Sequence, residues 1–155
     1  MNALRAIDPT LAKMEGLLPR VLRELDHYRD NPRFLLVLSC SFAELLIGTL
    51  IEARCKDGNR INDNTRDFPF SVRLTLLREM GLLHDLHFTW FNWLRKQRND
   101  AAHKAGFRFT TDRMPEWGGD EHKTPDKLFS LCANVLCIFW NQHVELFRQK
   151  LPIDA

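Results

Sequence analysis

The sequence lacks the motifs that mark several common enzyme classes. It contains no Gly-x-x-x-x-Gly-Lys-Ser/Thr loop for cradling phosphates and no Gly-x-Ser-x-Gly nucleophile elbow. It also lacks the strand–helix alternation that is typical of dinucleotide-binding folds. These absences exclude the common nucleotide-hydrolase and dinucleotide-binding interpretations, while a Ser/His/Asp triad without that elbow stays open.

The spacing of the histidines, cysteines and carboxylates gives little support for a metal site. His84 and His87 are spaced as two ligands on one helical turn would be, but no cysteine or carboxylate set at a known spacing completes a site. The four cysteines are Cys40, Cys55, Cys132 and Cys137. Because they include no Cys-x-x-Cys pair and mostly lie in apolar runs, we predict buried free thiols of a reducing cytosol. We expect no metal and no cofactor.

Signals for export and for membrane insertion are also missing. The N-terminus has no basic stretch followed by an apolar run, so no secretory signal is predicted. The apolar run 34–38 is interrupted by Ser39, Ser41 and Glu44, which predicts that no segment spans a bilayer. We therefore expect a cytoplasmic protein without membrane contact.

What the sequence does contain is the composition of a globular helical domain. Its 155 residues are 45% apolar and 27% charged, with a formal net charge of only +2, which predicts one domain over residues 1–155. Apolar residues recur at spacings of three and four, so we predict an all-α bundle of four to five helices. Predicted helix starts are Asp8-Pro9, Asn31-Pro32, Ser71, Asp85 and Thr124-Pro125, with a break near residues 15–19. The helix over about 32–54 is the most apolar and should be central.

Two long segments have no helical periodicity. Residues 56–70 contain Gly58, three asparagines and three aspartates, and are predicted to form a loop. Residues 105–124 form a second predicted loop. Within it, Phe107-Arg108-Phe109-Thr110 alternates apolar and polar residues, which predicts a short β-segment near 107–110. Since this loop directly follows His103, it is either a substrate-guiding lid or plain surface.

One short segment concentrates groups that can act on a phosphate. Residues 94–104 read Leu-Arg-Lys-Gln-Arg-Asn-Asp-Ala-Ala-His-Lys. An arginine can grip a phosphate with two parallel donors, whereas a histidine can move protons near neutral pH. Arg98 and His103 together could therefore hold and cleave a phosphodiester without a metal. The alternative is a structural role: Arg98 and His103 would lie near the C-terminus of a helix because the helix dipole favours cations at that end.

The spacing of Arg98 and His103 sets a condition on that chemistry. Residues five apart on a straight helix point about 140° away from each other. Either the helix loosens before His103, with Gly106 as a left-handed terminator, or a second copy of the chain supplies the missing group. The second option predicts a homodimer.

Charged neighbours extend the predicted site. Five cations against Asp100 give residues 95–108 a net charge of +4, enough for a small phosphate-attracting patch, although a solvated helix face would look the same. Glu44 interrupts the apolar helix, and an arginine of the motif is its natural partner. It would either orient Arg98 or Arg95, or serve as a structural ion pair or an exposed edge.

Arg98-Asn99 followed by Ala101-Ala102-His103 resembles the Arg-x(4–6)-His signature of the HEPN superfamily, whose preferred form has a polar residue after the arginine. The chain order Phe42-Ala43-Glu44-Leu45-Leu46, Arg73-Leu74, Met80-Gly81-Leu82-Leu83 and this motif is also similar to the mannitol-operon-repressor (MltR-like) family. The resemblance covers roughly residues 34–106. It implies a small helical bundle, and many HEPN domains are metal-independent ribonucleases that act as dimers.

The two resemblances imply different functions. The HEPN branch implies a toxin or defence endoribonuclease that cleaves RNA by attack of its 2′-hydroxyl at a dimer interface, with Arg98 and His103 catalytic. Supporting residues would be Asn99, Glu44 and Arg95, and contacts to the RNA backbone would come from Lys96, Lys104 and Arg108. The MltR-like branch implies a non-catalytic transcriptional regulator or protein-interaction module. No helix-turn-helix signal is evident, so such a regulator would act through another protein. An antitoxin or a regulatory protein is therefore an expected partner.

Overall fold

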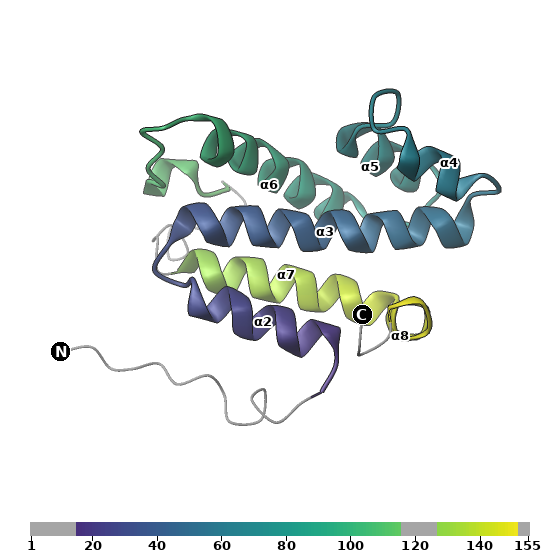
Figure 1. Ribbon diagram of the computed structural model, residues 1–155, viewed down its shortest axis with the longest axis horizontal. Coiled ribbons are helices and arrows are strands. Elements are labelled where there is room, and N and C mark those ends of the chain that lie inside the picture. The colour runs from purple at the N-terminus through teal and green to yellow at the C-terminus, as the bar shows by residue number, and fades with distance from the viewer. Residues whose placement is uncertain (1–14, 116–126, 152–155) are drawn as a thin grey trace.

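The computed structural model describes residues 15–115 and 127–151, and its helices pack around one long central helix (Figure 1). The central helix α3 has α4, α5 and α6 on one side and α2, α7 and α8 on the other (Figure 1). The elements are α2 (Leu17–His27), α3 (Pro32–Arg54), α4 (Gly58–Asp63), α5 (Phe70–Glu79), α6 (Asp85–His103), the 3-10 turn Thr111–Arg113, α7 (Leu128–Gln142) and α8 (Val144–Lys150). The all-α prediction is confirmed. The predicted number of helices is too low, because the described residues alone contain seven α-helices.

The helix α3 forms where the sequence predicts it and for the predicted reasons. Asn31 caps it by accepting a hydrogen bond from the Phe34 backbone, and Pro32 occupies its first turn, where a missing N–H costs nothing. One broad side of the helix is fully buried, at Leu35, Leu36, Ala43, Leu46, Ile47, Leu50 and Ile51. This helix therefore supplies the centre of the apolar core.

The prediction that polar residues break the apolar run of α3 is wrong. An 18-residue window of this helix has a mean hydropathy of 2.2, so α3 is long and apolar enough to cross a membrane by length and composition alone. Of that window, 61% is buried inside the bundle. Burial of this kind is what a core helix requires, and it accounts for the hydropathy without a bilayer.

The segment 56–70, predicted to be a loop, contains the short helix α4. Its sequence, Gly-Asn-Arg-Ile-Asn-Asp, has no apolar stripe. The helix is held instead by tertiary hydrogen bonds, because Asn62 Nδ2 donates to the Gly48 carbonyl at 2.8 Å and to Glu52 at 3.1 Å. Sequence periodicity cannot show contacts of this kind.

Other predicted boundaries shift by a few residues. Helix α5 begins at Phe70 after Pro69, so Ser71 is not its cap. Helix α6 begins at Asp85, with His84 in the cap position. Gly16, at φ 123°, precedes α2 within the predicted break. The predicted starts at Asp8-Pro9 and Thr124-Pro125 lie outside the described residues.

The C-terminal helix is divided, and the predicted β-segment is absent. The helical path breaks at His143, where φ −126° and ψ 26° separate α7 from α8. Residues 107–110 are irregular, and the described ranges contain no strand. Phe107 and Phe109 alternate with polar neighbours because they pack against the bundle from a loop. The alternation was therefore a sign of burial and not of sheet pairing.

Gly58 permits the close approach of α4 to α3, and we expect Gly58→Ala to destabilise the fold by about 3 kcal/mol. A Cβ at this position would lie 2.5 Å from the Glu52 Cα and would clash with the Ile51 carbonyl, and backbone cannot easily move away. Urea unfolding measures the loss. The matched control is Gly106→Ala, which meets nothing within 4 Å and should change stability by less than about 1 kcal/mol. Equal stability of the two variants would contradict this packing.

Two histidines lie in the aromatic part of the core, where His87 is buried and His143 is half-buried. The His87 ring lies 5.2 Å from the Phe139 ring and 5.9 Å from the Phe91 ring, and the His143 ring lies 5.2 Å from Phe139. Burial lowers the pKa of His87 below its ordinary value of 6.5, and the nearby histidines lower it further. Burial also lowers the pKa of His143. The folded protein therefore keeps both rings neutral where the unfolded chain would protonate them.

Stability should consequently fall as the pH drops below 6.5, the ordinary histidine value. Above that pH neither state binds these protons; below it the unfolded state binds more, which favours unfolding until the lowered folded-state pKa is passed. Urea unfolding at about pH 7.5 and about pH 5.5 measures the difference. The His87→Asn variant should show a smaller pH dependence. Identical unfolding curves of the wild-type protein at both pH values would refute this account.

Candidate functional site

Arg98 of α6 is bound to Glu44 of α3. The Arg98 Nη2 donates to Glu44 Oε1 at 2.7 Å, and the two side chains are 31% and 32% exposed. Arg98 points toward α3 because it lies four residues after Leu94 and three before Ala101, both of which are fully buried. Of the two arginines that the sequence offered as partners of Glu44, Arg98 is the one that pairs with it.

A pocket of about 320 Å³ opens beside this ion pair. It lies among α3, α5, α6 and the segment that precedes α5, and it is called the arginine pocket below. Its lining residues are Glu44, Thr65, Pro69, Phe70, Ser71, Arg73, Arg95, Arg98 and Asn99. Three guanidinium groups face one carboxylate there, which leaves a net charge of +2. Convergent cations in a concave site focus a positive potential that attracts anions.

All three arginines of this pocket carry an unused hydrogen-bond donor. The Nε atoms of Arg73, Arg95 and Arg98 are buried and have no hydrogen-bond partner within the described structure. Buried N–H groups are nearly always paired in folded proteins, because an unpaired one costs about 1–3 kcal/mol. An anion with several acceptor oxygens, such as a phosphate, would satisfy such donors and neutralise the charge. The arginine pocket is therefore the candidate site for an oxyanion.

Cys40 lies one helical turn before Glu44 and is buried beneath the site. Burial raises the pKa of its thiol to about 12, although the nearby Arg98 acts in the opposite direction. The thiol therefore stays protonated at neutral pH. A cysteine in this state is a packing residue and not a nucleophile.

His103 lies outside the arginine pocket. It is the last residue of α6, it is exposed, and it forms no hydrogen bond, ion pair or ring contact with another described residue. The helix remains regular up to His103, and positive φ occurs only at Gly16 and Gly81 within the described residues, so the proposed termination at Gly106 is wrong. Within one chain, His103 is therefore not among the residues that line the pocket of Arg98. His103 instead shares a face with Asn99, four residues earlier.

The predicted site residues are thus divided between several places. The arginine pocket contains Glu44, Arg95, Arg98 and Asn99. Outside it are Lys96, His103, Lys104 and Arg108. Lys96 and Arg108 are exposed, whereas Lys104 Nζ pairs with the carboxylate of Asp100 at 2.9 Å.

Five lining residues of the pocket were not among the predicted site residues: Thr65, Pro69, Phe70, Ser71 and Arg73. For Arg73 the sequence does hold a signal. It is half-buried and lies on the side of α5 that carries the apolar residues Phe70, Leu74 and Leu77. An arginine on such a face is expected to have a specific partner or ligand. The pattern did not show that this face of α5 meets α6.

Asp100 fastens the segment that follows α6. Its carboxylate binds Lys104 Nζ at 2.9 Å and accepts a hydrogen bond from Arg113 Nη1 at 3.0 Å. The hydrogen bonds from these two cations hold the pKa of Asp100 below its ordinary value. The indole of Trp93 also donates to the Arg113 carbonyl at 2.8 Å. Residues 104–113 are therefore held against α6.

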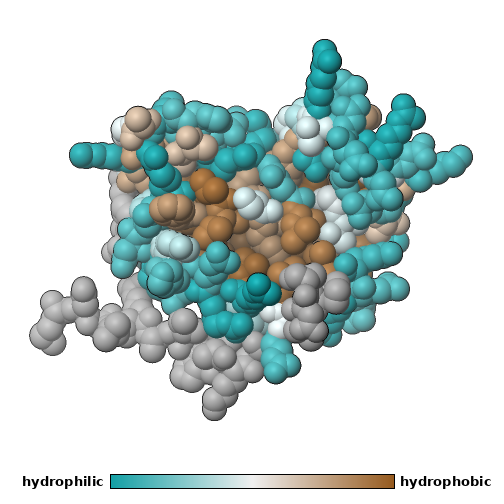
Figure 2. Space-filling view, viewed as in Figure 1, coloured by the Kyte–Doolittle hydropathy of each residue, from teal (hydrophilic) through white to brown (hydrophobic). Residues whose placement is uncertain are grey.

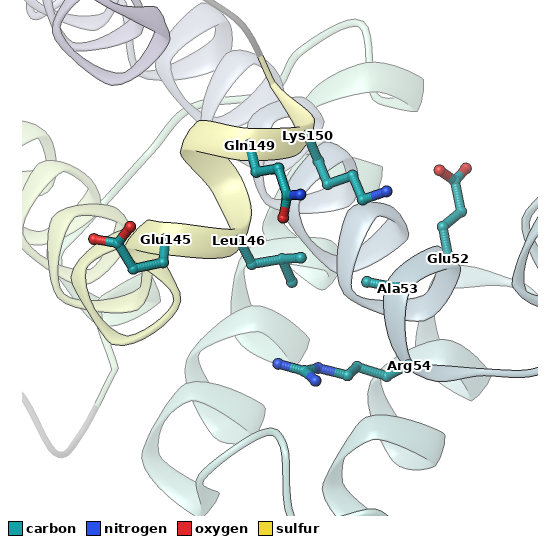
Figure 3. Close-up of a pocket in the computed structure, with 7 residues that line it drawn as sticks. All are labelled: Glu52, Ala53, Arg54, Glu145, Leu146, Gln149 and Lys150. Atoms are coloured by element: carbon teal, nitrogen blue, oxygen red, sulfur yellow. The ribbon is translucent and has the colours of Figure 1, made fainter.

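A larger pocket, of about 650 Å³, lies between the end of α3 and α8 (Figure 3). Its charges are mixed, with Glu52 and Arg54 on α3 and Glu145 and Lys150 on α8. Figure 3 shows the carboxylates of Glu52 and Glu145 on opposite sides and directed away from each other. Because its polar groups do not converge, this pocket offers no arrangement for binding one ligand.

The described ranges contain no group of three or more His, Cys, Asp or Glu side chains that could hold a metal ion. No family model, no curated protein and no solved structure matches the chain. The function is therefore inferred from the residues of the candidate site and their geometry.

Proposed function

We propose that the chain is a metal-independent endoribonuclease of the HEPN type, which binds a phosphodiester of RNA in the arginine pocket. The observation that carries this proposal is the convergence of Arg73, Arg95 and Arg98 on one pocket, each with a buried and unpaired Nε donor. Phosphate oxygens are the acceptors that such donors bind best. The resemblance of residues 98–103 to the HEPN motif suggests the reaction, which is metal-independent cleavage of RNA.

The chemistry needs little from the protein, because RNA carries its own nucleophile. The 2′-oxygen forms a bond to phosphorus while its proton passes to His103 acting as general base. The bond from phosphorus to the 5′-oxygen breaks, and that oxygen takes a proton from solvent water. Arg98, fixed by Glu44, stabilises the negative charge that develops on the phosphate oxygens. The products are a 2′,3′-cyclic phosphate and a 5′-hydroxyl.

This reaction requires a homodimer. One chain directs Arg98 into the pocket and leaves His103 on the surface, so a second copy must bring its His103 to the phosphate. In this proposal the dimer contact uses an exposed apolar surface of the kind that Figure 2 shows on one face of the molecule. On α3, Leu45 is 43% exposed. A groove there is lined by Leu17, Val21, Glu24, Leu38, Ser41, Phe42 and Leu45. Exposed apolar patches mark association surfaces, and Leu45 directly follows Glu44 of the arginine pocket.

The proposal is tested by incubating the purified protein with labelled RNA in the presence of a chelator. We expect cleavage, with 2′,3′-cyclic phosphate ends on the products. A wild-type protein that leaves the RNA intact, or that cuts only with added metal, would refute the proposal.

The second candidate is a non-catalytic MltR-like regulator or protein-interaction module. The pairing of Arg98 with Glu44 favours it, because this contact also fastens α6 to α3. The exposure of His103 argues against this candidate, because a structural histidine would pack or form a hydrogen bond at the helix end. This candidate is supported if the protein binds RNA weakly, cleaves none and captures another protein through α6.

A further inference from the structure

A second groove lies at the end of the molecule where α3 begins and α6 ends (Figure 1). Its volume is about 460 Å³, within the usual range of small-molecule sites. It is called the aromatic groove below, and its lining residues are Asn31, Pro32, Arg33, Phe107, Arg108 and Phe109. It contains two arginines, two phenylalanines and no carboxylate.

This combination suits a single-stranded nucleic acid. Proteins bind such strands by stacking bases on aromatic side chains while cations follow the phosphates. Phe107 and Phe109 are half-buried. The guanidinium groups of Arg113 and Arg33 lie over the Phe107 ring, so Phe109 is the ring available for stacking with a base. Arg108, which lies between the two phenylalanines in the chain, is exposed. A double helix, whose bases are already stacked, could not use the Phe109 ring.

The groove is fixed in shape by contacts that do not involve a ligand. Arg33 Nη2 donates to the carbonyls of Lys104 and Ala105 at 2.8 and 3.1 Å, which joins α3 to the end of α6. The guanidinium of Arg113 stands 4.9 Å from the centre of the Phe107 ring. The ring of Phe109 packs edge-on against Trp93. A groove that is already formed loses little entropy on binding.

The aromatic groove and the arginine pocket lie on either side of His103. Asn99 lines the arginine pocket, His103 follows on the same face of α6 one turn later, and the Lys104 carbonyl is bound by Arg33 of the groove. Along α3, Arg33 and Glu44 are separated by eleven residues, or about 16 Å of helix. A short extended strand can therefore reach from one site to the other past His103.

We infer that the aromatic groove is a nucleobase-binding site for single-stranded RNA, occupied by nucleotides adjacent to the phosphate in the arginine pocket. This inference rests on the proposed nuclease function, and it gives single-stranded RNA as the substrate class of that nuclease. Its test uses a strand that cannot be cleaved, so the two proposals can fail separately.

The experiment measures fluorescence anisotropy of a labelled 2′-O-methyl oligouridine, which lacks the nucleophilic hydroxyl. We expect Phe109→Ala to weaken binding about tenfold, and Phe109→Trp to keep it, because stacking needs an aromatic ring. Arg108→Ala should weaken binding and lower the slope of affinity against salt by about one. The matched control, Arg148→Ala, replaces an exposed arginine on α8 at the far end of the molecule and should bind like wild type.

Circular dichroism and thermal unfolding confirm that each variant is folded. If Phe109→Ala proves unfolded, the exposed Arg108→Ala and the ring-preserving Phe109→Trp decide the question. Wild-type affinity in the Arg108→Ala variant, or equal affinity of the protein for a blunt duplex, would overturn the inference. Groove-dependent binding by a protein that never cleaves RNA would uphold the inference and refute the nuclease.

Discussion

Replacing His103 with alanine is expected to lower RNA cleavage by about 10²–10⁴-fold, the usual contribution of a general base. The folding stability of this variant should not change, because His103 is exposed and forms no hydrogen bond or ion pair with another described residue. Rates are measured under single-turnover conditions with end-labelled RNA in chelator, and stability by urea unfolding.

The matched control for this variant is His84→Ala. His84 is also exposed and lies at the opposite end of α6, and its side chain forms no cap hydrogen bond. It should cleave RNA like the wild-type protein. Wild-type cleavage by the His103 variant would remove the histidine from the mechanism and leave the motif a packing role.

Replacing Arg98 with alanine is expected to lower cleavage by about 10²–10³-fold, which is typical for the loss of one group that stabilises transition-state charge. Lysine at position 98 should not restore the rate, because an ammonium cannot bind Glu44 and a phosphate with the planar fork of a guanidinium. The stability of both variants should fall by no more than about 1 kcal/mol, since the ion pair is about one-third exposed.

The Glu44→Gln variant separates catalysis from packing at the same contact. If Glu44 orients Arg98, the neutral amide should reduce the cleavage rate and leave the affinity for an uncleavable strand nearly unchanged. If the pair only fastens α6 to α3, Glu44→Gln and Arg98→Ala should lose the same stability and leave cleavage intact. Arg148→Ala on α8, an exposed position outside both grooves, serves as the control.

The sequence contained enough to predict the central helix but not the small elements around it. Asn31-Pro32 and a nearly all-apolar run specify α3 locally, so its boundaries were predictable. Helix α4 is polar and depends on Asn62 reaching the Gly48 carbonyl, a contact fourteen residues distant along the chain. The break at His143 has no proline or glycine to mark it. Elements that depend on tertiary contacts leave no periodic signal.

The candidate site shows the same division. The spacing of Arg98 and His103 already indicated that they point apart, and the regular course of α6 shows this geometry. The pairing of Arg98 with Glu44 could be anticipated, because a carboxylate on an apolar helix needs a partner. The presence of Arg73 in the pocket could not be anticipated, because it depends on the packing of α5 against α6.

The central claim is that the arginine pocket of one subunit and His103 of the other act on the same phosphodiester. It is tested most directly by mixing the Arg98→Ala and His103→Ala proteins after each has been shown to be folded and inactive. In a symmetric dimer, a one-to-one mixture that exchanges subunits should regain about one quarter of the wild-type rate, because half of the dimers then carry one intact site. Complete inactivity of a mixture whose subunits have exchanged would contradict the claim.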